Sequence, residues 1–174
     1  MDIKRFKAAL GQGGARPNQF KVELTFPSYV NIIDSAANIL VTGAAMPAST
    51  VNPAIIQYRG REVKLAGERI FDPWTITIVN DTRQSLRRPF EEWLNGMNSR
   101  ATNSSEFLTP RDYQTDITIE HLDRNSEALP GGIVQIRDAF PINMSEVALQ
   151  YAQNDIIEEF TVTFQYQDYD IVNP

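Results

Sequence analysis

The chain has 174 residues and no cysteine, which excludes a disulfide framework and every thiolate metal site; its length fits one domain, spanning residues 1–174. Hydrophobic residues make up 42% and charged residues 22%, a balance that excludes a disordered chain. No apolar run approaches the roughly 20 residues that span a bilayer. No secretory h-region is recognisable either, so we expect synthesis and folding in a cytoplasm.

The net charge of −6 is unevenly distributed along the chain. Residues 1–100 carry 13 Lys+Arg and 9 Asp+Glu, a net +4, whereas residues 101–174 carry 3 and 13, a net −10. This distribution argues against a large basic face for nucleic-acid phosphates. It fits either a solvated acidic surface or unlike patches that meet between copies of the chain.

The first part of the chain predicts a short helix and two strands. Residues 1–10 place apolar side chains on one helical face, and the glycines at 11–14 end that helix. The stretch "FKVELTF" at 20–26 alternates apolar and polar residues, as a half-buried strand does, and it stops at Pro27. The stretch "ILVTGAAMP" at 39–47 predicts a second strand.

Residues 49–65 predict an exposed excursion rather than a central strand. Pro53 and the alternating charges that follow are unfavourable inside a sheet, and Arg59-Gly60 predicts a turn between two extended arms.

A strand followed closely by a helix is predicted between residues 66 and 99. Trp74 begins a strand in which alternate residues face the core, and Asn80-Asp81 supply a helix cap. Pro89 should bend or restart the helix. An apolar stripe at helical spacing predicts that the helix packs on the sheet, with Phe90 and Trp93 in the core; its members are Leu86, Phe90, Trp93, Leu94 and Met97.

The remaining sequence predicts a loop and further strands. Residues 98–115 are polar and turn-rich, and strands are expected at 117–123, 131–144 and 158–172. Many strands with one substantial helix predict an all-β or mainly β (α+β) domain, a sandwich or partly closed barrel. The polar strand faces, rich in Thr, Gln, Glu and Asp, fit either a solvated outer face or the wall of a water-filled space.

Residue patterns that carry chemistry are nearly absent. His121 is the single histidine, and no Gly-x-Ser-x-Gly turn is present. The adjacent carboxylates at 91–92 and 158–159 do not converge on one point from a helix or strand. We therefore expect no catalytic residue, no metal site and no cofactor.

Several stretches, in this order, resemble the tail tube proteins of contractile-tailed bacteriophages, most closely the T-even type. The similarity covers about residues 15–99 and 133–170. The stretches that carry it are "ARPNQFKVEL" (15–24), "AGERIFDPWTITIVND" (66–81), "FEEW" (90–93), and "AFPINMSEVAL" with "DIIEEFTVTFQYQDYD" in the last third.

The resemblance implies two packed antiparallel sheets flanked by a helix, and a protomer that assembles as hexameric rings stacked into a hollow tube. The implied partners are the chain itself, a sheath protein, a baseplate or tube initiator, a tape measure protein inside the lumen, and DNA in transit without specific binding. The implied location is the virion tail, after synthesis in the host bacterial cytoplasm.

Carried onto this chain, the resemblance makes residues 1–15 an N-terminal segment, 81–99 the helix and 49–65 a loop that reaches a neighbouring ring. The candidate inter-subunit residues of that loop are Tyr58, Arg59, Arg61, Glu62 and Lys64. The candidate lumen residues are Glu23, Asp116 and Glu120, whose carboxylates would repel DNA phosphates.

Two other readings remain open from the sequence. One is the tube protein of a related injection machine (a tailocin, an extracellular contractile system or a type VI secretion system) or a baseplate tube initiator. The other is a monomeric β-barrel binding module that needs no self-assembly.

Overall fold

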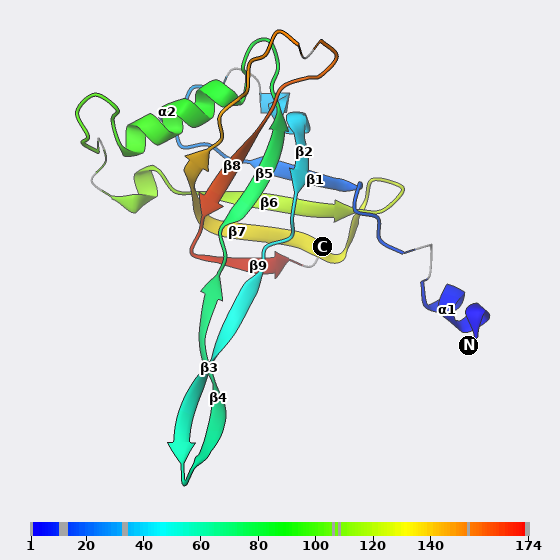
Figure 1. The fold of residues 1–174 in the computed structure, drawn as a ribbon. Coiled ribbons are helices and arrows are strands. Elements are labelled where there is room, and N and C mark those ends of the chain that lie inside the picture. The colour runs from blue at the N-terminus through cyan, green and yellow to red at the C-terminus, as the bar shows by residue number, and fades with distance from the viewer. Residues whose placement is uncertain are drawn as a thin grey trace.

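A computed structural model of the chain describes residues 2–10, 14–32, 35–105, 107, 109–152 and 154–172. Strands dominate, as predicted, and the helices are few and short (Figure 1). The elements, in chain order, are α1 (Ile3–Ala9), β1 (Phe20–Leu24), η1 (Ser35–Leu40), β2 (Val41–Ala44), β3 (Ser49–Tyr58), β4 (Arg61–Phe71), β5 (Trp74–Val79), α2 (Arg87–Met97), η2 (Pro110–Asp112), β6 (Thr115–Leu122), β7 (Ala128–Met144), β8 (Glu159–Gln165) and β9 (Asp168–Val172).

Two antiparallel sheets share the long strand β7. Sheet A consists of β1, β6, β9 and the first part of β7, up to Ala139; sheet B consists of β2, β5, β8 and the remainder of β7. At the junction Asp138 has a φ of 51°, in the left-handed region that few non-glycine residues adopt. Its backbone N–H donates to Asp116 Oδ1 at 3.1 Å, which stabilises the bend. The strands of sheet A therefore run across those of sheet B (Figure 1).

Alternating side chains from both sheets form one core. The inward residues of sheet A include Val22 and Ile117, and those of sheet B include Ile76 and Phe164; all are buried. Helix α2 packs against this core through Phe90 and Trp93, each 0% exposed. The confirmed fold class is mainly β, with two packed antiparallel sheets.

The aromatic side chains of the core bring both sheets and α2 together. The rings of Phe26 and Trp93 have centroids 5.5 Å apart, and those of Trp93 and Phe164 lie 6.2 Å apart. The indole N–H groups are also paired, because Trp93 Nε1 donates to Tyr113 O at 2.7 Å and Trp74 Nε1 donates to Ala45 O at 2.6 Å. Trp74, Phe90 and Trp93 are thus core residues, and both tryptophan indole N–H groups have hydrogen-bond acceptors.

The helix is shorter than the expected span of 81–99. It begins at Arg87 and ends at Met97, because Gln84 has a φ of 54° and interrupts any helix that starts at Asp81. Asp81 instead closes a turn, accepting hydrogen bonds from Ser85 N at 2.6 Å and Ser85 Oγ at 2.7 Å. Pro89 then lies in the first turn of α2, where a missing N–H costs little, so it does not bend the helix.

Three strand boundaries also differ from expectation. Residues 35–40 form a 3₁₀ helix, so the strand expected at 39–47 is only Val41–Ala44. β7 begins at Ala128 and passes through the Pro-Gly-Gly sequence; a Cβ on Gly132 would lie 2.9 Å from His121 O, so only glycine fits there. The expected strand at 158–172 is two strands, β8 in sheet B and β9 in sheet A.

No helix in the described part of the chain is long and apolar enough to cross a membrane.

Replacing Trp93 with alanine should lower the free energy of unfolding by about 3–5 kcal/mol, because it removes a large, fully buried ring from the contact between α2 and both sheets. Urea denaturation of the unassembled protein measures the change. Ile39→Ala is the matched control, since Ile39 is a large apolar residue that is 86% exposed. Equal stability of the two variants would contradict the central position of Trp93.

Removing Asp81 should destabilise the protein in a pH-dependent way. Burial tends to raise the pKa of Asp81, but hydrogen bonds from Ser85 and from the backbone of Arg83 and of Asp81 itself together outweigh it and hold the pKa below its ordinary value. The stabilisation is therefore present above the ordinary carboxyl pKa of about 4 and is lost as the pH falls through the folded-state pKa. Asp81→Ala should cost about 1–3 kcal/mol at pH 7, since Ser85 is buried and loses its acceptors. The difference in free energy of unfolding between the variant and wild type should become smaller below about pH 4. A difference that does not change with pH would contradict the role given to the Asp81 carboxylate.

Candidate interaction surfaces

The side of sheet A that faces away from the core is mainly polar over four strands, with Ile133 and Val172 as its apolar members. Register places Glu23 beside Thr118, Thr118 beside Gln135, and Gln135 beside Asp170, from β1 through β6 and β7 to β9. We call this surface the acidic face of sheet A. Its charged members are five carboxylates and two cations, for a net charge of −3: Glu23, Asp116, Glu120, Asp168 and Asp170, with Lys21 and Arg137.

The two cations of the acidic face are held by its carboxylates. Lys21 contacts Glu23 and lies 3.9 Å from Glu120, and the hydrogen bond with Glu23 raises the pKa of Lys21 above its ordinary value. Arg137 pairs with Asp170. The cations are therefore committed to neighbouring carboxylates, and the excess charge of the surface is negative.

The three predicted lumen residues lie together on this acidic face, and none is in the core. Glu23 and Asp116 are exposed, and Glu120 is half-buried beside Lys21. Asp116 has a second role that the sequence did not indicate, because its Oδ1 accepts from Asp138 N at the bend of β7 and its Oδ2 accepts from Gln135 Nε2 at 3.2 Å.

The outward side of sheet B differs in composition from the acidic face. Its central residues are threonines, and Thr75 Oγ1 lies 3.0 Å from Thr163 Oγ1 on the neighbouring strand. Thr77 and Thr161 are register partners beside them. This side is polar without a comparable concentration of charge.

Strands β3 and β4 form a hairpin that projects away from both sheets (Figure 1). The excursion expected at 49–65 is therefore a regular two-stranded ribbon that continues to Phe71. Its turn is Arg59-Gly60, with φ values of 48° and 80°, as a two-residue hairpin turn requires. Every residue from 50 to 70 is exposed.

The hairpin has one apolar face and one more polar face. Register pairs Ile56 with Val63 and Tyr58 with Arg61 on one side, and Gln57 with Glu62 on the other. We call the first side the apolar face of the hairpin; its members are Ala54, Ile56, Tyr58, Val63 and Leu65, with Arg61 at the tip.

The predicted inter-subunit residues are divided between these two faces. Tyr58 and Arg61 belong to the apolar face, and Arg59 in the turn lies with its guanidinium carbon 5.5 Å from the centre of the Tyr58 ring. Glu62 and Lys64 lie on the opposite face, where Gln57 Nε2 donates to Glu62 Oε1 at 3.3 Å.

The root of the hairpin is attached to the body beside β9. Arg69 Nη1 donates to Ser49 Oγ at 2.8 Å, and Ser49 Oγ lies 3.3 Å from the Tyr169 hydroxyl. The ring of Phe71 packs against that of Tyr169, with centroids 5.7 Å apart. The hairpin therefore leaves the body from a fixed position.

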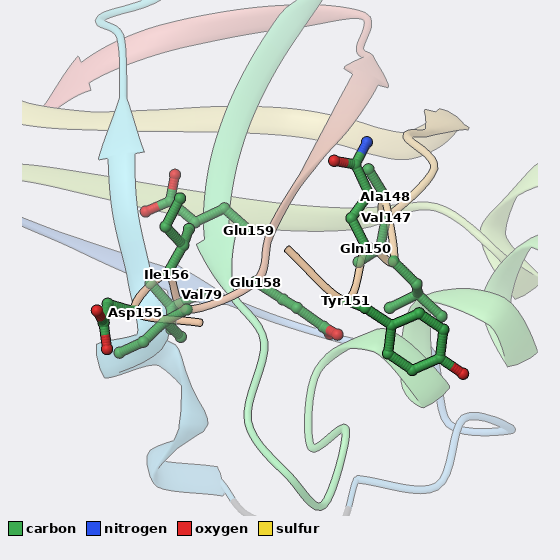
Figure 2. Close-up of a pocket in the computed structure, with 11 residues that line it drawn as sticks. Val79, Val147, Ala148, Gln150, Tyr151, Asp155, Ile156, Glu158 and Glu159 are labelled. Carbon is green, nitrogen blue, oxygen red and sulfur yellow. The ribbon is translucent and has the colours of Figure 1, made fainter. Parts of the chain in front are cut away.

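A second exposed apolar surface, which the sequence analysis missed, lies between β7 and β8. A hollow of about 1040 Å³ is lined by Val79 and by residues 147–151 and 155–159. Figure 2 shows these lining residues. We call the hollow the acidic groove, because Asp155, Glu158 and Glu159 accompany its apolar side chains. Leu149 is 80% exposed and Ile157 is 70% exposed. A sequence signal was present in the non-alternating apolar residues of "VALQYAQNDII", but that pattern predicts no regular element.

Sheet A has open edges at β1 and β9. Within the described residues, β1 pairs only with β6 and β9 pairs only with β7, so one side of each strand is free of backbone partners. Each of these strands has 5 residues. Open edges are available for pairing with another chain.

The side chains that could in principle act in catalysis or bind a metal make structural contacts instead. His121 Nε2 lies 2.9 Å from Arg16 O. Glu91 pairs with Arg87 and Arg100, and Glu92 accepts from Asn31 N at 2.9 Å. The described residues contain no group of three or more His, Cys, Asp or Glu arranged to hold a metal ion.

Comparison with known sequences gives the family. A sequence model of the phage tail tube protein family matches residues 15–172. The chain belongs to the phage tail tube protein family. It is 28% identical over 152 residues to tail tube protein gp19 of Enterobacteria phage T4, with 86% of each chain covered. It is 24% identical over 168 residues to the tail tube protein of Serratia phage KSP90, covering 94% of this chain and 93% of that one.

Solved structures of contractile injection systems have the same fold. A chain of the anti-feeding prophage baseplate superposes with a TM-score of 0.67 at 16% identity, covering 91% of this tail tube protein and 95% of that chain. A chain of the extended sheath-tube complex of the extracellular injection system PVC gives 0.57 at 14% identity, covering 95% and 97%.

The resemblance inferred from the sequence is confirmed by the family match. As a tail tube protein, the chain is a structural component of the virion tail and not an enzyme.

Proposed function

We propose that this tail tube protein assembles as hexameric rings, that the rings stack into the inner tube of a contractile tail, and that the tube conducts DNA during ejection. The observation that carries the proposal is the pair of open edges of sheet A. The strand directions alternate from β1 through β6 and β7 to β9. β9 of one copy can therefore pair with β1 of the next without breaking the antiparallel pattern, and ring closure leaves no open edge on sheet A.

The acidic face then becomes the wall of the channel. Sheet B and α2 cover the other side of sheet A, so only the acidic face is free to line a lumen. Glu23, Asp116 and Glu120 would face the channel, together with Asp168 and Asp170. A net negative wall repels the phosphates of DNA from all sides and does not retain it, whereas a basic wall would bind many phosphates at once.

The partners follow from this arrangement. The tape measure protein and DNA occupy the lumen in turn, and neither needs a specific site on the acidic face. The sheath contacts the outer side of the tube, and a baseplate or tube initiator contacts the first ring. The solved PVC chain in a sheath-tube complex, which has the same fold, supports the contact with a sheath.

A second candidate function is the tube or baseplate subunit of a related contractile injection system. The fold similarity to a chain of the anti-feeding prophage baseplate favours it as the alternative. The match to the phage tail tube family over residues 15–172 favours a phage tail. Tubes isolated with DNA-filled heads attached would support the phage tail, and tubes isolated without heads would support the related injection system.

Paired cysteines should join neighbouring protomers in tubes formed by the purified protein. Because the wild-type chain has no cysteine, only introduced thiols can react. Combining Lys21→Cys or Glu23→Cys on β1 with Asp168→Cys or Asp170→Cys on β9 gives four double variants that test three antiparallel registers, because the pairs 21/170 and 23/168 share one register. Directly opposed residues have Cβ atoms about 4.5–5.5 Å apart, close to disulfide distance.

Oxidation of assembled tubes should give covalent ladders up to the hexamer in at least one double variant, read on a non-reducing gel. The four single variants are the controls and should give no ladder. Tubes that are visible by electron microscopy but give no ladder in any double variant would disprove a β1–β9 contact in the three registers tested. Dispersed monomers at all concentrations would instead support a monomeric binding module.

Reversing the charge of the acidic face should make the tube retain DNA. We expect wild-type tubes to bind little fluorescent duplex DNA, whereas tubes of Glu23→Lys/Glu120→Lys should bind it, with an affinity that falls steeply as salt rises. Asp116 is left unchanged in this test because it also stabilises the bend of β7. Glu127→Lys, an exposed site on the β6–β7 turn, is the matched control. Equal DNA binding by all three tubes would mean that these carboxylates do not line the channel.

A further inference from the structure

Near the bend of β7, one residue of β6 lies opposite two residues of β7. The register between these strands shifts at Asp116, which leaves this residue opposite both Arg137 and Asp138. This is a β-bulge with one extra residue on β7, an arrangement that bends a strand and redirects its side chains. Asp138 has a φ of 51°, which costs energy for a residue other than glycine, so its surroundings must hold it there.

The bulge changes which side chains of β7 face the core. Ile136 before it and Ala139 after it are buried, whereas residues 137 and 138 between them are both exposed. Strict alternation after Ile136 would turn Asp138 inward and Ala139 outward. The extra residue therefore keeps the apolar side of β7 inward in both sheets, and it leaves Arg137 on the outer side.

Asp116 holds the bulge from the opposite strand. Its Oδ1 accepts from Asp138 N at 3.1 Å, and its Oδ2 accepts from Gln135 Nε2 at 3.2 Å. These two residues lie on either side of Arg137, so one carboxylate fixes β7 before and after that position. Without the carboxylate the extra residue could shift along β7, and a shift of one residue reverses the two faces of a strand.

Arg137 connects the bulge to the open edge strand β9. Its carbonyl accepts from Gln167 N at 3.1 Å, one residue before β9 begins, and its guanidinium pairs with Asp170. Within the described residues β9 pairs with β7 alone, and that pairing begins at Arg137. The ion pair is exposed and contributes little by itself. The position of this edge therefore depends on the backbone at Arg137, which the bulge determines.

We infer that Asp116 is a positioning residue for assembly, because it holds the bulge that places β9 where the β1 edge of the next copy can pair with it. The inference rests on the proposed contact between β9 and β1. It gives Asp116 a role that is separate from its negative charge in the channel. In this role Asp116 acts through Asp138 and Arg137 and does not itself touch the next copy.

The experiment first separates the hydrogen bonds of Asp116 from its charge. Asp116→Ala removes both acceptors and should raise the protein concentration needed for tube assembly by about ten-fold or more. Asp116→Asn keeps an oxygen for Asp138 N, and the Gln135 amide can turn to accept from the new amide group. Assembly of Asp116→Asn should therefore stay within about two-fold of wild type. Sedimentation and negative-stain electron microscopy measure assembly, and circular dichroism verifies folding.

A second substitution tests whether Asp116 acts through the bulge. Glycine adopts a positive φ without strain, so Asp138→Gly should hold the bulge without help from β6. The double variant Asp116→Ala/Asp138→Gly should then assemble at near the wild-type concentration. Glu127→Ala is the matched control, because it removes an exposed carboxylate from the β6–β7 turn, away from the bulge, and should leave assembly unchanged.

Hydrogen exchange of the unassembled chains tests the effect on β9 directly. In Asp116→Ala, amides of residues 168–172 should exchange about ten-fold faster than in wild type, and the increase should exceed that in the core strand β5. A purely structural loss of stability would speed exchange in β9 and β5 alike. If Asp116→Ala does not fold, the double variant decides: assembly near the wild-type concentration supports the inference, and a folded double variant that does not assemble overturns it.

Three results would overturn the inference while the proposed function stands. One is normal assembly by folded Asp116→Ala. Another is equal impairment of Asp116→Ala and Asp116→Asn, which would assign the effect to charge. The third is impairment of Asp116→Ala that Asp138→Gly does not relieve, or that comes with equal changes of exchange in β9 and β5. A wild-type chain that forms no tubes would overturn the inference and the proposed function together.

Discussion

The contact between α2 and the two sheets is the interaction on which the other surfaces depend. Phe90 and Trp93 stack with centroids 6.1 Å apart. Phe26, two residues after the end of β1, and Phe164 from β8 pack against them. Because these rings occupy the space between the sheets, the inward faces of both sheets are fully used. The polar faces must then point outward, and the two open edges of sheet A must remain at its sides.

Strand β7 belongs to both sheets, and the two sheets carry different surface features. Its bend at Asp138, stabilised by Asp116, lets one strand belong to two sheets whose strands cross. Sheet A carries the acidic face and the two open edges. Sheet B carries both projecting features, because the hairpin enters at one end of β5 and the acidic groove is built at the other. The acidic face and the two open edges thus belong to sheet A, whereas the two exposed apolar surfaces adjoin the ends of β5 in sheet B.

Local sequence patterns predicted most helices and strands correctly. Features that depend on contacts between residues far apart in the sequence were not predicted. Alternation identified β1, β5 and β6, the helical stripe identified Phe90 and Trp93, and Arg59-Gly60 identified the hairpin turn. Alternation continues across Tyr166, so it did not reveal that β8 and β9 belong to different sheets. The left-handed conformation of Gln84, which shortens α2, has no sequence signature. The acidic groove could not be predicted because its residues follow no period and become adjacent only after folding.

The composition of the edge strands β1 and β9 affects how fast subunits would associate. Each has 5 residues, of which two are charged, a combination that disfavours indiscriminate strand addition. A collision that matches only these edges therefore gains little and dissociates quickly. In the assembly proposed above, productive growth would require several contacts to form at once, so free subunits would persist below a nucleation threshold. A preformed template that presents those contacts together would remove this delay and determine where growth begins.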